Sequence, residues 1–142
     1  MNYEEYKNNF IRNPEEQEFA YQSMNSVALF YEDFHEAINY YTAVLGTPNY
    51  QEGEFTFGWR IGSGWLTILK GRKGNPHNVE VSFIMHSSEE ADRLQQAFIA
   101  AGGVWQEPMD TLMYIPVHLC PVTDPFGVEI MVYSKTALPE TD

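Results

Sequence analysis

Apolar and polar residues follow the same order in two parts of the chain. Residues 25–46 begin with an apolar run typical of a strand, continue with an amphipathic stretch typical of a helix, and end at Gly46. Residues 79–103 repeat this order and end at Gly102 and Gly103. A repeat of this length predicts a duplicated structural unit.

Each predicted helix has a capping motif at its start and one apolar stripe. Asp33 and Glu36 form a D-x-x-E pair, and Ser87 and Glu90 form an S-x-x-E pair. Such pairs satisfy backbone amides at a helix start. The stripes contain Phe34, Ala37, Ile38, Tyr41, Val44 and Leu45 in the first helix, and Ala91, Leu94, Phe98 and Ala101 in the second. We therefore expect each helix to bury one face.

Runs rich in aromatic and β-branched residues follow each helix, as in strands. In the first unit they are residues 54–61 and 65–70. In the second unit they are a short stretch near Val104, then residues 113–122 and 128–133. The sequence therefore predicts an α+β fold with the order β-α-β-β-β, twice.

The repeat also sets the expected domain limits. Residues 25–135 are predicted to form one domain, with units at about 25–71 and 79–134, and residues 136–142 form a C-terminal tail. Residues 1–24 lie outside the repeat and mix aromatic with acidic residues, which indicates one or two short helices interrupted near Asn13 and Pro14. We interpret this arm as a packing or dimer-stabilising element rather than a substrate lid.

Composition and charge narrow the partners and the compartment. The chain has 142 residues and a formal charge of −12, which opposes binding to nucleic acid or to an anionic membrane. It contains neither a membrane-length apolar run nor a signal-peptide pattern. Its single cysteine, Cys120, has no partner for an internal disulfide, so we expect a cytoplasmic protein.

Three features together resemble a known superfamily. They are the two β-α-β-β-β units, the spacing of Phe34, Tyr40 or Tyr41, Leu45 and Gly46, and the sequence Asp-Pro-Phe-Gly at residues 124–127 before the last strand. This combination is similar to the vicinal oxygen chelate superfamily, which includes glyoxalase I, extradiol dioxygenases, and the bleomycin and fosfomycin resistance proteins. The resemblance implies a cup-shaped mixed sheet with helices on the outside. Turn chemistry alone also explains residues 124–127.

The same resemblance implies a metal site inside the cup, with four His, Glu or Gln ligands. Spacing from the helix caps and from Asp124 assigns the four positions to Ser26, Thr67, Glu80 and Met131. Only Glu80 is a credible ligand for zinc, nickel or iron. We therefore expect no family metal and no cofactor, although a divalent metal is not excluded.

Glu129 and His118 are the candidate catalytic residues. Glu129 shares a strand face with Met131 and lies in an apolar run, where a charge is costly without a partner. For His118 two arguments disagree, because the family spacing directs Leu119 into the cup whereas chemistry favours His118 and Cys120 there. A buried, inert thiol is favoured for Cys120 over a nucleophile.

The candidate ligand-binding residues are Glu80, four aromatic residues and one arginine. Apolar walls with a few polar groups are typical of small-molecule sites, and Arg60 is a candidate for meeting an anionic group. The aromatic candidates are Phe30, Trp59, Trp65 and Tyr133.

Two functions remain open from the sequence. The first is a metal-independent module that binds an apolar or aromatic small molecule in the cup, as the resemblance to the resistance proteins implies. The alternative is a glyoxalase-like lyase, isomerase or dioxygenase with a non-standard site around Glu80, Glu129 and His118. In either case we expect a homodimer, because open sheet edges need cover.

Overall fold

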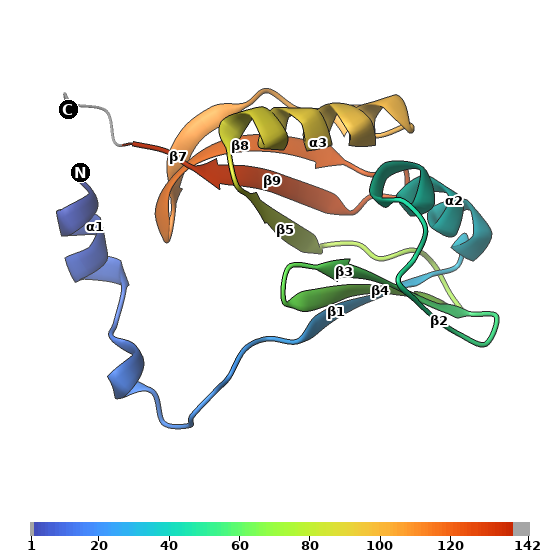
Figure 1. The fold of residues 1–142 in the computed structure, drawn as a ribbon, viewed down its shortest axis with the longest axis horizontal. Helices are drawn as coiled ribbons and strands as arrows, with labels where there is room; N and C mark the ends of the chain where they lie inside the picture. The colour runs from blue at the N-terminus through green and yellow to red at the C-terminus, as the bar shows by residue number, and fades with distance from the viewer. Residues whose placement is uncertain (1, 138–142) are drawn as a thin grey trace.

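A computed structural model describes residues 2–137 and contains two units that each begin with a strand, a helix and further strands, with one more strand in the second unit (Figure 1). The first unit consists of β1 (Ser26–Tyr31), α2 (Phe34–Leu45), β2 (Tyr50–Glu52), β3 (Thr56–Ile61) and β4 (Gly64–Lys70). The second consists of β5 (Glu80–Met85), α3 (Ser88–Ala100), β6 (Val104–Trp105), β7 (Met109–Met113), β8 (Ile115–Thr123) and β9 (Glu129–Lys135). The predicted α+β class and the repeat are confirmed.

Each unit forms its own mixed sheet. The first sheet has the order β1-β4-β3-β2, in which β1 runs parallel to β4 and the other pairs are antiparallel. The second has the order β5-β9-β8-β6, with β7 also paired to β8, and β5 runs parallel to β9. The first strand of each unit is therefore an edge strand of its sheet.

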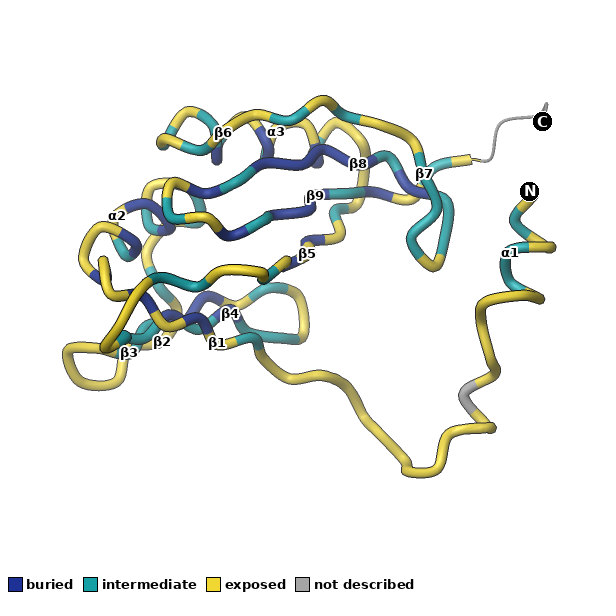
Figure 2. Tube along the Cα trace, turned by 180° about the vertical axis from the view of Figure 1, so that it is seen from behind, coloured by how far each residue is buried: buried dark blue, intermediate teal, exposed yellow. Residues whose placement is uncertain are grey.

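The core lies between the sheets and the two helices, which cover one face of each sheet (Figures 1 and 2). Alternate residues of β1 and β5 point into it, because successive side chains of a strand lie on opposite faces. The largest side chains that are fully buried are Trp59, Tyr31, Tyr41, Phe34, Phe98, Ile68, Ile130 and Gln95.

The two helix starts differ, although both were expected to be capped. The Oγ atom of Ser87 accepts a hydrogen bond of 3.2 Å from the Glu90 amide, as expected. The carboxylate of Asp33 caps no helical amide and instead accepts a bond of 2.9 Å from Nδ2 of Asn75. The capping box expected at Asp33 is therefore wrong, because that side chain holds the segment that connects the two units.

The turn at residues 124–127 joins the two units. Asp124 is buried, and its Oδ1 atom accepts hydrogen bonds of 2.8 Å from the amides of Phe126 and Val128. Its Oδ2 atom accepts bonds of 2.8 Å from the hydroxyl groups of Tyr31 and Tyr41, which belong to the first unit. Asp124 thus closes its own turn and connects the second unit to β1 and α2.

The N-terminal arm extends away from the two sheets (Figures 1 and 2). It contains α1 (Tyr3–Phe10) and the short 3-10 helix η1 (Pro14–Glu16). The hydroxyl of Tyr3 donates to the carbonyl of Tyr114 at 3.0 Å, which ties α1 to the β7–β8 hairpin. Of the expected tail 136–142, residues 138–142 lie outside the described residues.

Among residues 2–137, no helix has the length and the apolar character needed to cross a membrane.

Candidate functional site

The face of each sheet that points away from the helices carries most of the candidate ligand-binding residues, and we call it the open face. Strand pairing defines its members, because residues opposite each other in a ladder share a face. In the first sheet they include Ser26, Ala28, Phe30, Arg60, Trp65 and Thr67. In the second sheet they include Glu80, Ser82, Ile84, Leu119, Pro121, Glu129, Met131 and Tyr133.

Two carboxylates lie next to each other on the open face. Glu80 and Glu129 are directly opposite in the β5–β9 pairing. Glu129 is half-buried, and its carboxylate accepts hydrogen bonds of 3.0 Å from Nε2 of Gln106 and 3.2 Å from Oγ1 of Thr123. Glu80 is exposed. The pair therefore combines one oriented carboxylate with one that solvent reaches freely.

The four positions that the resemblance assigned to a metal also lie on the open face. They supply two hydroxyl groups from Ser26 and Thr67, a thioether from Met131, and the Glu80 carboxylate. A catalytic zinc site uses three protein ligands from Cys, His, Asp or Glu. One carboxylate with two hydroxyls and a thioether does not fit such an ion, so we assign no chemistry to a metal at these positions.

Three of the predicted aromatic residues are on the open face. Phe30 is 54% exposed, whereas Trp65 and Tyr133 are half-buried. The Arg60 guanidinium lies 4.9 Å from the centroid of the Trp65 ring, a cation–π distance. Burial, with a smaller contribution from Tyr114 and then Glu80, raises the pKa of Tyr133, so its hydroxyl stays neutral and can donate a hydrogen bond.

Trp59 belongs to the core instead. Its side chain is 1% exposed and points toward α2, where its Nε1 atom donates to the carbonyl of Gly46 at 2.8 Å. The ring also packs against Tyr41 at 6.3 Å between centroids. The prediction that Trp59 contacts a ligand is therefore wrong, because strand β3 turns it to the helix-covered face.

His118 also points away from the open face. The β8–β9 pairing places Leu119 opposite Tyr133, so His118 lies on the face that α3 covers. Its ring nitrogens lie 3.3 Å from Oδ1 of Asp92 and 2.9 Å from Oδ1 of Asp110. The expectation that His118 joins Glu129 and Glu80 in one site is therefore wrong. The family spacing, which directed Leu119 rather than His118 into the cup, was correct.

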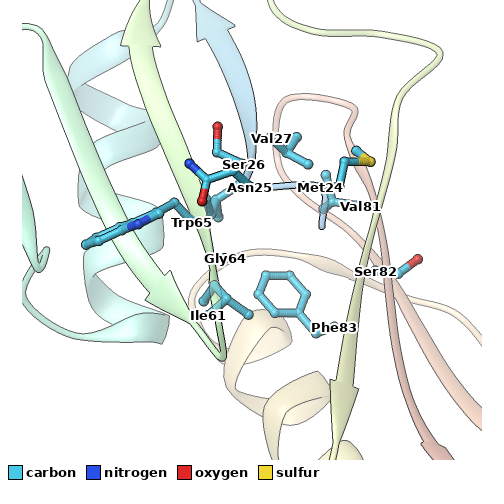
Figure 3. Close-up of a pocket in the computed structure, with 11 residues that line it drawn as sticks. Met24, Asn25, Ser26, Val27, Ile61, Gly64, Trp65, Val81, Ser82 and Phe83 are labelled. Carbon is cyan, nitrogen blue, oxygen red and sulfur yellow. The ribbon is translucent and has the colours of Figure 1, made fainter. Parts of the chain in front are cut away.

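A small cavity lies where the edge strands β1 and β5 approach each other (Figure 3). It has a volume of about 170 Å³. Most of its walls are apolar, with amide and hydroxyl groups at Asn25, Ser26 and Ser82. Its other lining residues are Met24, Val27, Ile61, Gly64, Trp65, Leu66, Val81 and Phe83.

Sequence reasoning found only Trp65 of these lining residues as a ligand contact. Ile61 and Phe83 were missed because they lie in ordinary strand patterns. The repeat did contain a signal for this cavity. The first strands of the two units, β1 and β5, occupy equivalent edge positions in their sheets, so a repeat of this kind indicates that they lie near each other.

Comparison with known proteins agrees with this arrangement. The family model described as Glyoxalase/Bleomycin resistance protein/Dioxygenase superfamily matches residues 23–132, which is more than half of the chain. No curated protein matches the sequence significantly.

Solved structures with the same fold share little sequence with this chain. A glyoxalase/bleomycin resistance protein from Albidiferax ferrireducens has a TM-score of 0.65 and 22% identity, over 80% of this chain and 98% of that one. A glyoxalase-related enzyme from Fulvimarina pelagi has a TM-score of 0.64 and 17% identity, over 84% and 92%. A lactoylglutathione lyase from Agrobacterium tumefaciens has a TM-score of 0.63 and 15% identity, over 82% and 96%. At these identities the likeness extends to the fold alone.

Proposed function

Because the chain belongs to the glyoxalase/bleomycin resistance protein/dioxygenase superfamily, we propose that it binds an apolar or aromatic small molecule without the family metal. The observation that carries this proposal is the cavity between β1 and β5, whose apolar walls and few polar groups are typical of small-molecule sites. The donor set of Ser26, Thr67, Glu80 and Met131 supports binding rather than metal-based catalysis, since it holds a single strong ligand.

The size of the cavity indicates how such a ligand lies. Sites for drug-sized ligands measure roughly 300–1,000 Å³, so a cavity of about 170 Å³ accepts one ring or a short chain. The remainder of the ligand would extend over the open face, where Phe30 is exposed and Trp65 is half-buried. Ser82 lines the cavity and lies two residues from Glu80 on the same face. We therefore propose that Glu80 and Glu129 favour ligands with a positively charged group.

Tryptophan fluorescence provides a direct test. Of the three tryptophans, Trp65 alone lines the cavity, whereas Trp59 is buried and Trp105 is exposed elsewhere. Small aromatic compounds in cationic, neutral and anionic forms would be titrated into the full chain. The cationic forms should bind most tightly and quench the emission, and Trp65→Phe should remove this change. The matched control Trp105→Phe should retain it.

A second variant tests the carboxylate. Glu129→Gln keeps the shape of the side chain and removes its charge, so affinity for the cationic compounds should fall about tenfold or more, as for a lost bond to a charged group. The thermal midpoint should fall only slightly, because the bonds from Gln106 and Thr123 lose a charged acceptor while the shape of the side chain is kept. Equal affinity in Glu129→Gln and in the parent protein would exclude Glu129 from the site, and failure of every compound to bind would contradict the proposal.

We further propose that two chains associate. Support comes from apolar side chains that the single chain leaves exposed on its open face, including Phe30, Ile84 and Met109. The arm exposes further apolar residues, namely Phe10, Ile11, Phe19, Tyr21 and Met24. Large exposed apolar surface commonly marks a protein interface. A second copy would cover these residues and deepen the cavity next to Met24.

A further inference from the structure

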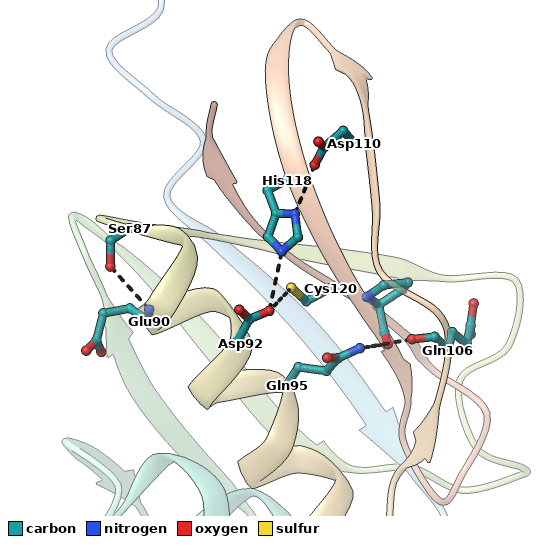
Figure 4. Close-up of polar contacts among 9 residues, drawn as sticks. Ser87, Glu90, Asp92, Gln95, Gln106, Asp110, His118 and Cys120 are labelled. Carbon is teal, nitrogen blue, oxygen red and sulfur yellow. Dashed lines mark hydrogen bonds and ion pairs between the residues drawn. The ribbon is translucent and has the colours of Figure 1, made fainter. Parts of the chain in front are cut away.

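A cluster of metal-binding side chains lies on the helix-covered side of the second sheet, away from the open face (Figure 4). His118 and Cys120 come from β8 and point toward Asp92 of α3. Oδ1 of Asp92 lies 3.3 Å from Nε2 of His118 and 3.0 Å from Sγ of Cys120. All three donor atoms lie within 4.8 Å of one another.

We propose that Asp92, His118 and Cys120 bind one divalent transition metal ion, with Zn²⁺ as the best match. Carboxylate oxygen, imidazole nitrogen and thiolate sulfur are the three ligand types that zinc uses in proteins. From zinc–ligand bonds of about 2.0–2.3 Å, tetrahedral ligands stand roughly 3.3–3.6 Å apart. The two distances from Asp92 are therefore only a few tenths of an ångström from those that a bound ion requires.

Asp110 acts as a positioning residue for the histidine. Its Oδ1 atom lies 2.9 Å from Nδ1 of His118, and the two residues are directly opposite in the β7–β8 pairing. A proton on Nδ1 that is donated to Asp110 leaves the lone pair of Nε2 directed toward Asp92 and Cys120. Metal-binding histidines commonly have such a carboxylate on the other nitrogen, which fixes the ring and raises its basicity.

A proton occupies the sulfur donor atom when no metal is bound. Burial first, and then the hydrogen bond to Asp92, raise the pKa of the Cys120 thiol to about 12. The thiol therefore donates to Asp92 at neutral pH and is a poor nucleophile on its own. A metal ion would replace this proton, so its affinity should increase with pH.

Solvent reaches the cluster from one side. Cys120 is fully buried, whereas the side chains of His118 and Asp92 are 25% and 56% exposed. This gradient leaves an entry path for the ion and an open position for water as a fourth ligand. The formal charge of −12 attracts cations to the protein as a whole.

The proposal can be tested on the full chain after treatment with a chelator. Zn²⁺ would be added in a calorimetric titration, and Co²⁺ would be added as a spectroscopic probe. We expect one ion per chain and a thiolate-to-cobalt charge-transfer band, which only a sulfur ligand produces. Cys120→Ser should remove the band. Asp92→Asn should weaken binding about tenfold or more.

Asp110→Asn distinguishes a positioning residue from a ligand. Binding should weaken by about 10–100-fold, while the charge-transfer band keeps its shape because Cys120 still coordinates the ion. His35→Gln is the matched control, because His35 is an exposed histidine at the start of α2. This substitution should leave the metal affinity unchanged.

Circular dichroism would establish that each variant is folded. Asp92 is exposed on α3, so Asp92→Asn should keep the fold even if Cys120→Ser does not. The proposal would be overturned if the chain bound no metal at micromolar concentration or if cobalt gave no charge-transfer band. Equal affinity in Asp92→Asn and in the parent protein would also overturn it. The metal cluster and the proposed ligand site lie apart, so a failure of one proposal does not affect the other. Cys120→Ser should therefore leave the fluorescence quenching at Trp65 unchanged.

Discussion

Removing either tyrosine hydroxyl that donates to Asp124 should destabilise the protein more than removing a tyrosine hydroxyl with a neutral partner. Tyr31 and Tyr41 are fully buried, and each donates to Oδ2 of Asp124 at 2.8 Å. Burial, followed by neighbouring charge that includes Asp124, raises the pKa of both phenols, so both remain protonated donors. Tyr40 offers the matched control, because its hydroxyl donates to the carbonyl of Phe98 at 2.9 Å.

The expected magnitudes follow from the charge of the acceptor. A hydrogen bond to a charged group contributes about 1.5–3 kcal/mol, whereas a neutral bond contributes about 0.5–1.5 kcal/mol. Tyr31→Phe and Tyr41→Phe should therefore each cost about twice as much as Tyr40→Phe. In the double variant Oδ2 has no side-chain donor, so the loss should exceed the sum of the two single losses by about 0.5–3 kcal/mol.

Urea unfolding followed by circular dichroism would measure these free energies, with the slope against urea checked for constancy. Asp124→Ala should cost about 3–5 kcal/mol, as for a broken buried charge interaction. The reasoning would be refuted if Tyr31→Phe and Tyr41→Phe cost no more than Tyr40→Phe. Strict additivity in the double variant would contradict the shared acceptor.

Three further outcomes are expected. Gly103→Ala should lower the free energy of unfolding by about 1–3 kcal/mol in urea, because its Cβ would stand 2.8 Å from the Phe98 carbonyl; an unchanged midpoint would show that the backbone adjusts. Gln95→Met should cost about 1–3 kcal/mol in the same assay, because the Gln95 amide donates to two carbonyls at 3.0 and 2.8 Å; no loss would mean that water replaces the amide. Sedimentation should give twice the chain mass of 16.4 kDa, and the double variant Phe19→Ser with Tyr21→Ser should weaken the dimer; a monomeric parent at micromolar concentration would exclude association.

The regular elements were predictable where the residue pattern was long. The stripes of α2 and α3 and the turn at Asp124 gave the order of the units, because periodicity and turn chemistry are local properties. Strands β2 (Tyr50–Glu52) and β7 (Met109–Met113) were not predicted. They are short and contain polar residues, and they exist because a neighbouring strand offers free hydrogen-bonding groups.

The candidate site was predictable only as far as strand parity could be fixed. The spacing from Asp124 placed Glu129 and Met131 correctly on one face, because that turn anchors the register of β9. For His118 the spacing from Asp124 disagreed with the expectation that a histidine lines a ligand cavity. The spacing was correct. The strand of Trp59 contains no turn motif that fixes which of its residues face the helices, so its direction could not be predicted. The cavity between β1 and β5 depends on how two separate sheets meet, which no local pattern encodes.

The pairing of strands within each unit has a consequence for the order of folding. Within residues 2–137, each backbone ladder joins strands of the same unit, including β1 with β4 and β5 with β9. The bond from Tyr31 to Asp124 instead connects residues 93 positions apart in the chain. Long-range contacts pay a larger loop-closure entropy before they form. We therefore expect the units to form first and to dock afterwards, so that Tyr31→Phe accelerates unfolding while the folding rate hardly changes. The lifetime of the native state would then depend in part on the Asp124 carboxylate, which joins the two units.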